Sequence, residues 1–184
     1  MIIIPKGYDS VIIPKGEYGK LKFGGELLDI HATHQDVFSC EDAATTRGYP
    51  LEHELKTSLL DTNNGPILVH IPGDKLVNLR EVKCALKHEF GGGKQQACRA
   101  SEKTSTLLHC EFGTVNPFSK FLAELPQFVS EDLFEIDPRW VGTNAGALNR
   151  YVKFDPNLLR EMKKYTKLVT GSFSKKKEEL GGEW

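Results

Sequence analysis

The chain carries two kinds of apolar pattern, one typical of short strands and one of helices. Apolar runs at 56–60 and 67–71 flank the polar segment 61–66, a combination that predicts a β-hairpin. Further short strands are predicted at 127–129, 140–142 and 150–154. We expect the hairpin to lie near the middle of a sheet.

Four helices are predicted from capping residues and apolar spacing. Ser39 and Asp42 match a capping box that opens a helix over 40–47, and the Gly and Pro that follow end it. The other helices begin after Asn78, after Ser101 and at Asp155. Their apolar positions include Leu79, Val82, Leu86, Leu107, Leu108, Leu158, Leu159, Met162 and Tyr165.

The order of these elements favours one fold class. Strands and helices intermix without a regular βαβ rhythm, and 184 residues suit one domain. We therefore predict a single α+β domain with a mixed, mainly antiparallel, barrel-like sheet and peripheral helices. The sequence Ile-Ile-Pro-Lys-Gly occurs at 3–7 and again at 12–16, which predicts two short strands in an N-terminal hairpin.

Composition narrows the function classes only slightly. The formal net charge of −1 gives no overall signal for polyanion binding, so a nucleic-acid contact must be local. The four cysteines lie far apart without a CxxC pair, and the apolar start of the chain is too short for a secretion signal or a membrane span. We expect a cytoplasmic protein.

Two segments about fifty residues apart are candidates for chemistry. Lys56 lies inside a predicted strand, where its ammonium needs an anion or a route to water. In the loop 112–118, Gly113 permits close approach of its backbone to a ligand, and Pro117 restricts Asn116 to an extended conformation. Such a loop can aim backbone groups at a ribose or a developing oxyanion. Each segment is compatible with a purely structural role as well.

Two other kinds of site are weaker alternatives. His31, His34 and Cys40 suggest a metal site, and His109 with Cys110 a second pair, but zinc sites normally present three or four ligands in recognisable pairs. A cysteine nucleophile is an equally weak alternative, because Cys40 and Cys110 also suit the core. We therefore predict no metal and no cofactor.

Several motifs together resemble the YbaK-like, prolyl-tRNA synthetase-associated editing domain. They are, in order, the helix segment 37–48, the lysine strand at Lys56, the strand and turn 67–74, Asn78-Leu79, and Ala100-Ser101-Glu102 followed by the loop 113–118, which is similar to the family's GxxxP loop. The resemblance covers about 34–164. It implies an editing domain at 31–168, an N-terminal extension at 1–30 and a basic C-terminal tail at 169–184.

The resemblance implies hydrolysis of the ester that joins a wrong amino acid to tRNA, with Cys or Ala on tRNA-Pro as the expected substrate. Lys56 would contact the terminal phosphate or the acyl-bearing end, and the backbone of Gly113, Thr114, Val115, Asn116 and Pro117 would hold the terminal ribose and the ester carbonyl. No protein nucleophile is needed, because the ester is already reactive. The expected partner is tRNA, and prolyl-tRNA synthetase is a second candidate partner.

The acyl pocket and the tRNA contact are expected elsewhere on the same domain. Pocket walls are expected at His34, Val37, Phe38, Phe112, Thr143, Asn144 and Gly146, where shape would select the side chain. Relatives often have a small hydroxyl residue at Asn116 and an aspartate near 130–132, so specificity is open. Lysines that could meet tRNA phosphates are Lys163, Lys164, Lys175, Lys176 and Lys177, although a lysine run near a terminus is more often simply solvated.

A rival interpretation keeps the fold without the reaction. A non-catalytic module that binds tRNA or a synthetase could have the same sequence pattern, because fold and chemistry can separate.

Overall fold

The computed structural model describes residues 20–23, 26–110, 114–118, 122–164 and 166–177. The expected N-terminal hairpin at 3–16 and Tyr165 lie outside these ranges. In chain order the elements, with η marking 3₁₀ helices, are β1 (Lys20–Phe23), β2 (Glu26–Ala32), α1 (Cys40–Arg47), η1 (Leu51–His53), β3 (Leu55–Thr62), β4 (Ile67–Pro72), β5 (Lys75–Val77), α2 (Leu79–Phe90), β6 (Ala97–Arg99), α3 (Glu102–Leu107), β7 (Gln127–Ser130), η2 (Glu131–Phe134), β8 (Val141–Asn144), β9 (Arg150–Phe154), η3 (Pro156–Lys164), β10 (Leu168–Gly171) and β11 (Ser174–Lys176).

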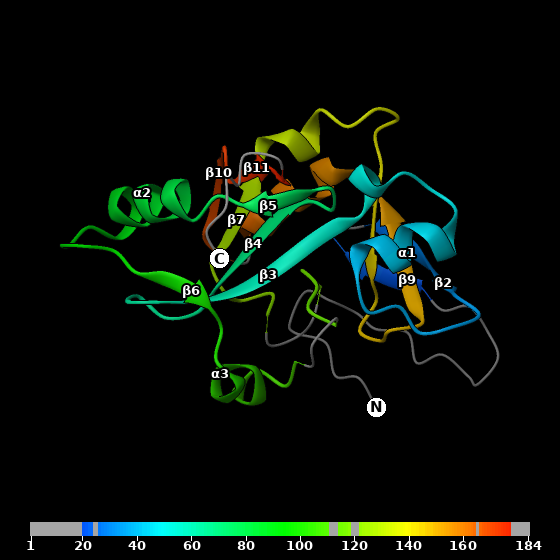
Figure 1. Cartoon of the computed structure of the whole chain (residues 1–184), viewed down its shortest axis with the longest axis horizontal. Helices are drawn as coiled ribbons and strands as arrows, with labels where there is room; N and C mark the ends of the chain where they lie inside the picture. Colours follow the sequence, from blue (N-terminus) through cyan, green and yellow to red (C-terminus); the bar gives the residue numbers. More distant parts are fainter. Residues whose placement is uncertain (1–19, 24–25, 111–113, 119–121, 165, 178–184) are drawn as a thin grey trace.

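The strands form three sheets. Their orders are β1-β2-β9-β8, β10-β7-β4-β3-β6 and β11-β5, and β7 runs parallel to both β4 and β10 while the other pairs are antiparallel. A single bridge between Glu54 and Gly142 links the first two sheets. Figure 1 shows α1, β2 and β9 at one end of the long strand β3, and α2 and β6 at the other. The predicted α+β class with a mainly antiparallel mixed sheet is confirmed.

The expected barrel-like closure is wrong for the described strands. β1 and β8 are the edges of the first sheet, and β10 and β6 are the edges of the second. Closing a barrel requires every strand to have two paired neighbours. The single bridge at Glu54 joins the sheets at one point and leaves them open.

Local sequence signals account for the best-predicted elements. α1 begins where Ser39 accepts a hydrogen bond from the Asp42 amide, and it ends at Gly48, whose φ of 71° is left-handed. β3 and β4 form the predicted hairpin, with Leu60 opposite Ile67. α2 follows its Asn78 cap, although Leu79 remains 38% exposed.

The two faces of the five-stranded sheet have different neighbours. Alternate residues of β4, beginning with Ile67, pack with Val82 and Leu86 of α2 in one apolar cluster. On the other face Leu59 and Leu68 pack with Leu122, in a cluster that Val115 also contacts. Because side chains alternate along a strand, β3 directs Leu55, Thr57 and Leu59 toward one face and Glu54, Lys56 and Leu60 toward the other.

The largest apolar cluster lies on the inner face of the four-stranded sheet. Leu28, Val141 and Phe154 from this sheet meet Leu55 and Phe118, together with Leu159 and Met162 of η3. The helix predicted from Asp155 is thus a 3₁₀ helix in the structure, with the expected apolar side buried. None of the described helices is long and apolar enough to cross a bilayer.

Segments near both ends of the chain take part in these sheets. β2 pairs with β9, so that Ile30 lies opposite Val152. Near the C-terminus β10 pairs with β7 and β11 pairs with β5, and Phe173 between them is only 2% exposed. The boundaries of the three expected segments, at 30 and 168, stay a prediction.

Candidate active site

The loop 114–118 is held by its own side chains. Asn116, 2% exposed, donates from Nδ2 to the Thr114 carbonyl at 2.9 Å and accepts at Oδ1 from the Phe118 amide, also at 2.9 Å. Phe118 packs edge-on against Phe154, with ring centroids 5.2 Å apart. The loop backbone is therefore fixed relative to the core. Phe112 and Gly113, the other expected loop residues, lie outside the described residues.

Asn144, at the end of β8, binds the same loop from outside. Its Nδ2 donates to the Val115 carbonyl at 3.1 Å, and its Oδ1 accepts from Asn116 Nδ2 at 3.1 Å and from the Gly146 amide at 3.2 Å. The structure therefore brings together the GxxxP-like loop and the expected pocket segment 143–146. The neighbouring Thr143 is 1% exposed, and its buried hydroxyl has no hydrogen-bond partner within the part of the chain that the structure describes.

The segment that holds the remaining expected wall residues is hydrogen-bonded to the connection that follows β8. The Val37 amide donates to the Leu148 carbonyl at 3.1 Å, and the Thr33 amide donates to the Asn149 carbonyl at 2.9 Å. Val37 is buried, whereas His34 is exposed and Phe38 is 58% exposed. The segment 33–37 thus runs beside the connection between β8 and β9, with Phe38 directed largely to solvent.

Lys56 lies on the other side of β3. It pairs with Ile71, which belongs to the α2 face, while Thr57 next to it bonds His70 on the loop face at 3.0 Å. Lys56 is half-buried, and its Nζ donates to the Lys75 carbonyl at 3.5 Å. Among the described residues it forms no ion pair and no hydrogen bond with the loop. The cation and the loop backbone therefore occupy different faces of the sheet.

One of the expected tail lysines approaches the same region as Lys56. Lys177 binds Glu41 in the first turn of α1 at 2.6 Å, and this hydrogen bond is the largest effect that lowers the Glu41 pKa, with a smaller one from Lys56. Lys175 and Lys176 belong to β11. Lys163 and Lys164 instead end η3, where Lys164 pairs with Glu161. The five lysines therefore lie in two separate groups.

A buried ion pair joins α1 to β3. Arg47 Nη1 donates to both carboxylate oxygens of Glu54, at 3.0 and 2.9 Å, and to the hydroxyl of Tyr49 at 3.2 Å. Burial raises the pKa of Glu54, and the charge of Arg47 opposes that effect. The Arg47 guanidinium also stacks on Tyr151, 4.5 Å from the ring centroid. This network fixes the end of α1 beside β9.

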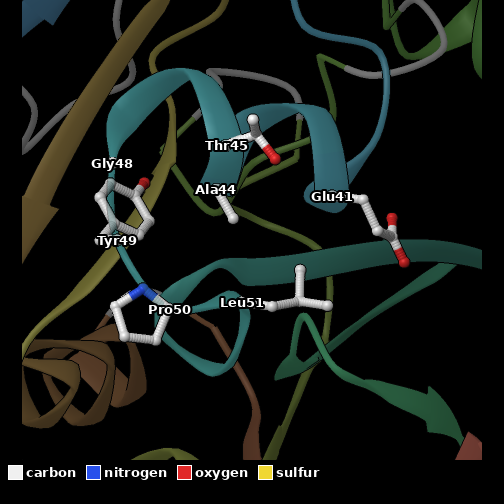
Figure 2. Close-up of a pocket in the computed structure, with 7 residues that line it drawn as sticks. All are labelled: Glu41, Ala44, Thr45, Gly48, Tyr49, Pro50 and Leu51. Carbon is white, nitrogen blue, oxygen red and sulfur yellow. The ribbon is translucent and has the colours of Figure 1, made fainter.

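A groove lies between α1 and the segment 49–51 that follows it (Figure 2). Its volume is about 580 Å³, and it is lined by Glu41, Ala44, Thr45, Gly48, Tyr49, Pro50 and Leu51. Figure 2 shows α1 on one side of the groove and Pro50 and Leu51 on the other. None of these residues is among those expected to form the acyl pocket.

The cysteine and metal alternatives gain no support from the geometry. Burial, followed by the charge of Glu54, raises the pKa of Cys40 to about 11, and burial raises the pKa of Cys110. A protonated thiol is a poor nucleophile at neutral pH. Among the described residues no group of three His, Cys, Asp or Glu side chains could hold a metal ion.

Sequence reasoning named Asn116 and Asn144 but not their pairing, and it missed the network of Arg47, Tyr49 and Glu54. Arg47 stands beside the helix-ending Gly48, where a basic residue is common for capping reasons alone. The one available signal was the placement of Glu54 directly before an apolar strand, where a carboxylate needs a partner.

The sequence over residues 34–162 matches the model of the aminoacyl-tRNA editing domain family. The chain belongs to this family, as its YbaK-like motifs imply. No curated protein sequence matches the chain significantly.

Solved structures share the fold at low sequence identity. A proposed trans-editing enzyme for prolyl-tRNA synthetase is 18% identical, with a TM-score of 0.64 over 80% of this chain and 87% of that one. The hypothetical protein APE2540 is 24% identical, with a TM-score of 0.67 over 83% and 94%. A scaffold from the computational grafting of linear epitopes is 17% identical, with a TM-score of 0.65 over 80% and 87%.

Proposed function

We propose that this protein hydrolyses the ester bond of mischarged tRNA, acting in trans. The observation that carries the proposal is the family match over 34–162, which includes both Lys56 and the loop 114–118. By analogy with the proposed trans-editing enzyme for prolyl-tRNA synthetase, tRNA-Pro is the proposed substrate and prolyl-tRNA synthetase is a candidate partner. Alanine and cysteine, the proposed amino acids, follow from the YbaK-like resemblance and not from this neighbour. The cytoplasm, where charged tRNA is found, is the expected location.

The loop backbone is assigned to the ester. Anchoring through Asn116 and Phe118 holds the backbone without help from the substrate. Fixed backbone donors that face a developing oxyanion need no reorganisation during the reaction, which is the usual source of their catalytic effect. The nucleophile is then a bound water or a hydroxyl of the substrate, since the ester is reactive once positioned.

Lys56 is assigned to an anionic group of the tRNA end, at a distance from the ester. A half-buried lysine that forms no ion pair within the described chain is suited to an external anion. Lys56 lies on the face of β3 opposite the loop, where its charge acts on Cys40 and Glu41 of α1. This location fits a phosphate contact better than a contact with the ester carbonyl. Lys177, held at Glu41, adds positive charge to the same side.

The test is a deacylation panel. tRNA-Pro charged with Ala, Cys or Pro is incubated with the wild-type protein, with Lys56→Ala and with Lys87→Ala, an exposed lysine of α2 that serves as the control. We expect hydrolysis of Ala- or Cys-tRNA-Pro at least about tenfold above buffer, sparing of Pro-tRNA-Pro, and a loss only in Lys56→Ala. If no mischarged tRNA of any kind is hydrolysed but charged tRNA is still bound, the rival binding module is correct.

The lysines of β11 need a different test from deletion. Removing residues 171–184 would also remove Phe173, which is 2% exposed in the core. Replacing Lys175 and Lys176 by Gln keeps Phe173 in the core. If both meet phosphates, the slope of log K against log salt for tRNA binding becomes shallower by about 0.7–0.9 per lysine. An unchanged slope means that β11 does not contact tRNA.

A further inference from the structure

Asn116 braces the loop 114–118 from within. Pro117 has no N–H, so the next backbone donor of the loop is the Phe118 amide, and Asn116 Oδ1 accepts from it at 2.9 Å. The Nδ2 of the same Asn116 side chain donates to the Thr114 carbonyl at 2.9 Å. A buried amide is costly unless its polar atoms are bonded, so these bonds define one loop conformation.

Asn144 ties the braced loop to β8. Its Nδ2 donates to the Val115 carbonyl at 3.1 Å, while its Oδ1 accepts from Asn116 Nδ2 at 3.1 Å. A side-chain amide presents a donor nitrogen and an acceptor oxygen on the same carbon, which neither a carboxylate nor a hydroxyl matches at neutral pH without rearrangement. The third bond, from the Gly146 amide at 3.2 Å, orients the Asn144 side chain itself.

The partners of both amides are loop and turn groups. Asn116 is 2% exposed, which leaves almost none of its surface for a ligand. Val115 and Phe118 pack the loop against two different apolar clusters. The paired side-chain amides add a third attachment, to β8. Catalysis through backbone groups tolerates deviations of only about 0.5 Å, so the amide bonds control the groups that act on the ester.

We infer that Asn116 and Asn144 form a clamp that positions the loop for ester hydrolysis, rather than walls that select the amino acid. The inference rests on the proposed function, because it assumes that the loop backbone acts on the ester. Both asparagines are thereby positioning residues that act through the loop.

A double-mutant cycle tests the clamp. Single-turnover rates and KM are measured on the mischarged tRNA that the wild-type protein hydrolyses best, for Asn116→Ala, Asn144→Ala, the double variant, and Asn149→Ala as an exposed control in the same β8–β9 connection. We expect each single clamp variant to lose about 10–100-fold in rate with KM within about twofold of wild type. The double variant should be no slower than the worse single variant, because residues in contact are not additive. Multiplicative losses, losses confined to KM, or rates equal to Asn149→Ala overturn the inference.

Asn144→Asp should give a pH dependence of the hydrolysis rate that a general loss of packing would not produce. The ionised carboxylate still accepts from Asn116 but cannot donate to Val115, whereas the protonated carboxyl can do both. The ratio of the Asn144→Asp rate to the wild-type rate should therefore rise as the pH falls through the pKa of the new carboxyl. A ratio independent of pH contradicts the clamp.

Hydrogen exchange separates this inference from the proposed function. Without tRNA, the Phe118 amide should exchange at least about tenfold faster in Asn116→Ala than in Asn149→Ala. Wild-type protein that hydrolyses no mischarged tRNA refutes the proposed function and, with it, the catalytic role of the clamp, whatever the exchange result. An active wild-type protein with unchanged Phe118 exchange refutes the clamp alone.

Discussion

Arg47 donates from Nη1 to both carboxylate oxygens of Glu54, and the two side chains are 1% and 4% exposed. Because each charge is buried with the other as its partner, removing one leaves an uncompensated ion. We predict that Glu54→Ala lowers the free energy of unfolding by about 3–5 kcal/mol in urea titrations. Replacing both by apolar residues, in Arg47→Met with Glu54→Leu, should cost less than Glu54→Ala alone.

The surface pair of Lys164 and Glu161 is the control for that comparison. Exposed pairs contribute little, so Glu161→Ala should leave the urea midpoint unchanged. A Glu54→Ala midpoint equal to that of Glu161→Ala would mean that the buried pair does not hold α1 against β3.

Gly142 gives a second prediction about this region. The Tyr49 hydroxyl occupies the position that a Cβ on Gly142 would take. Gly142→Ala should therefore destabilise the protein by about 1–3 kcal/mol through overpacking. Tyr49→Phe removes the clashing oxygen, so the double variant Gly142→Ala with Tyr49→Phe should recover part of the lost stability. Gly93→Ala, where nothing lies within 4 Å of the new Cβ, should stay close to wild type in the same thermal unfolding assay.

His70 predicts a pH dependence of stability. It is fully buried between Thr57 and Gln127, and burial lowers its pKa from 6.5 to about 4. Between these values the unfolded chain binds the proton and the folded protein does not, so stability falls as the pH decreases, by about 1.4 kcal/mol per unit. The loss totals roughly 3 kcal/mol at pH 4. Unfolding of wild type and His70→Gln across this range isolates the effect, since only wild type should show it. Parallel curves would contradict the assignment.

Phe173 tests whether the segment after residue 162 belongs to the folded domain. Its ring packs against Phe128, with centroids 5.4 Å apart. Phe173→Ala should cost about 3–5 kcal/mol of unfolding free energy, as expected for a buried aromatic residue. The matched control is Leu107→Ala, since Leu107 is 69% exposed and its loss should change stability by at most about 0.5 kcal/mol. Equal midpoints for the two variants would mean that residues 168–177 do not contribute to the stability of the folded domain.

Elements with local signals were predictable from the sequence. α1 is set by Ser39, which accepts from the Asp42 amide, and by Gly48 with its positive φ, all within ten residues of one another. The β3–β4 hairpin likewise depends on the turn between its own strands. The site residues inside these elements could be named because their family-like order is also local.

Pairings between distant segments could not be predicted. β5 pairs with β11 and β7 with β10, although nothing in these short runs specifies a partner. Apolar spacing in the helices also overstated burial, because the neighbouring elements leave Leu79 and Leu107 uncovered. The bond between Asn116 and Asn144 joins residues 28 positions apart. The separation of Lys56 from the loop depends on strand register, and a shift of one residue would reverse it.

Release of labelled alanine or cysteine from mischarged tRNA-Pro under single-turnover conditions is the decisive measurement. The wild-type protein should release the amino acid at least about tenfold faster than buffer, while Lys56→Ala should approach the buffer rate and Lys87→Ala should match wild type. A wild-type rate equal to buffer on every mischarged tRNA would contradict the proposed hydrolysis.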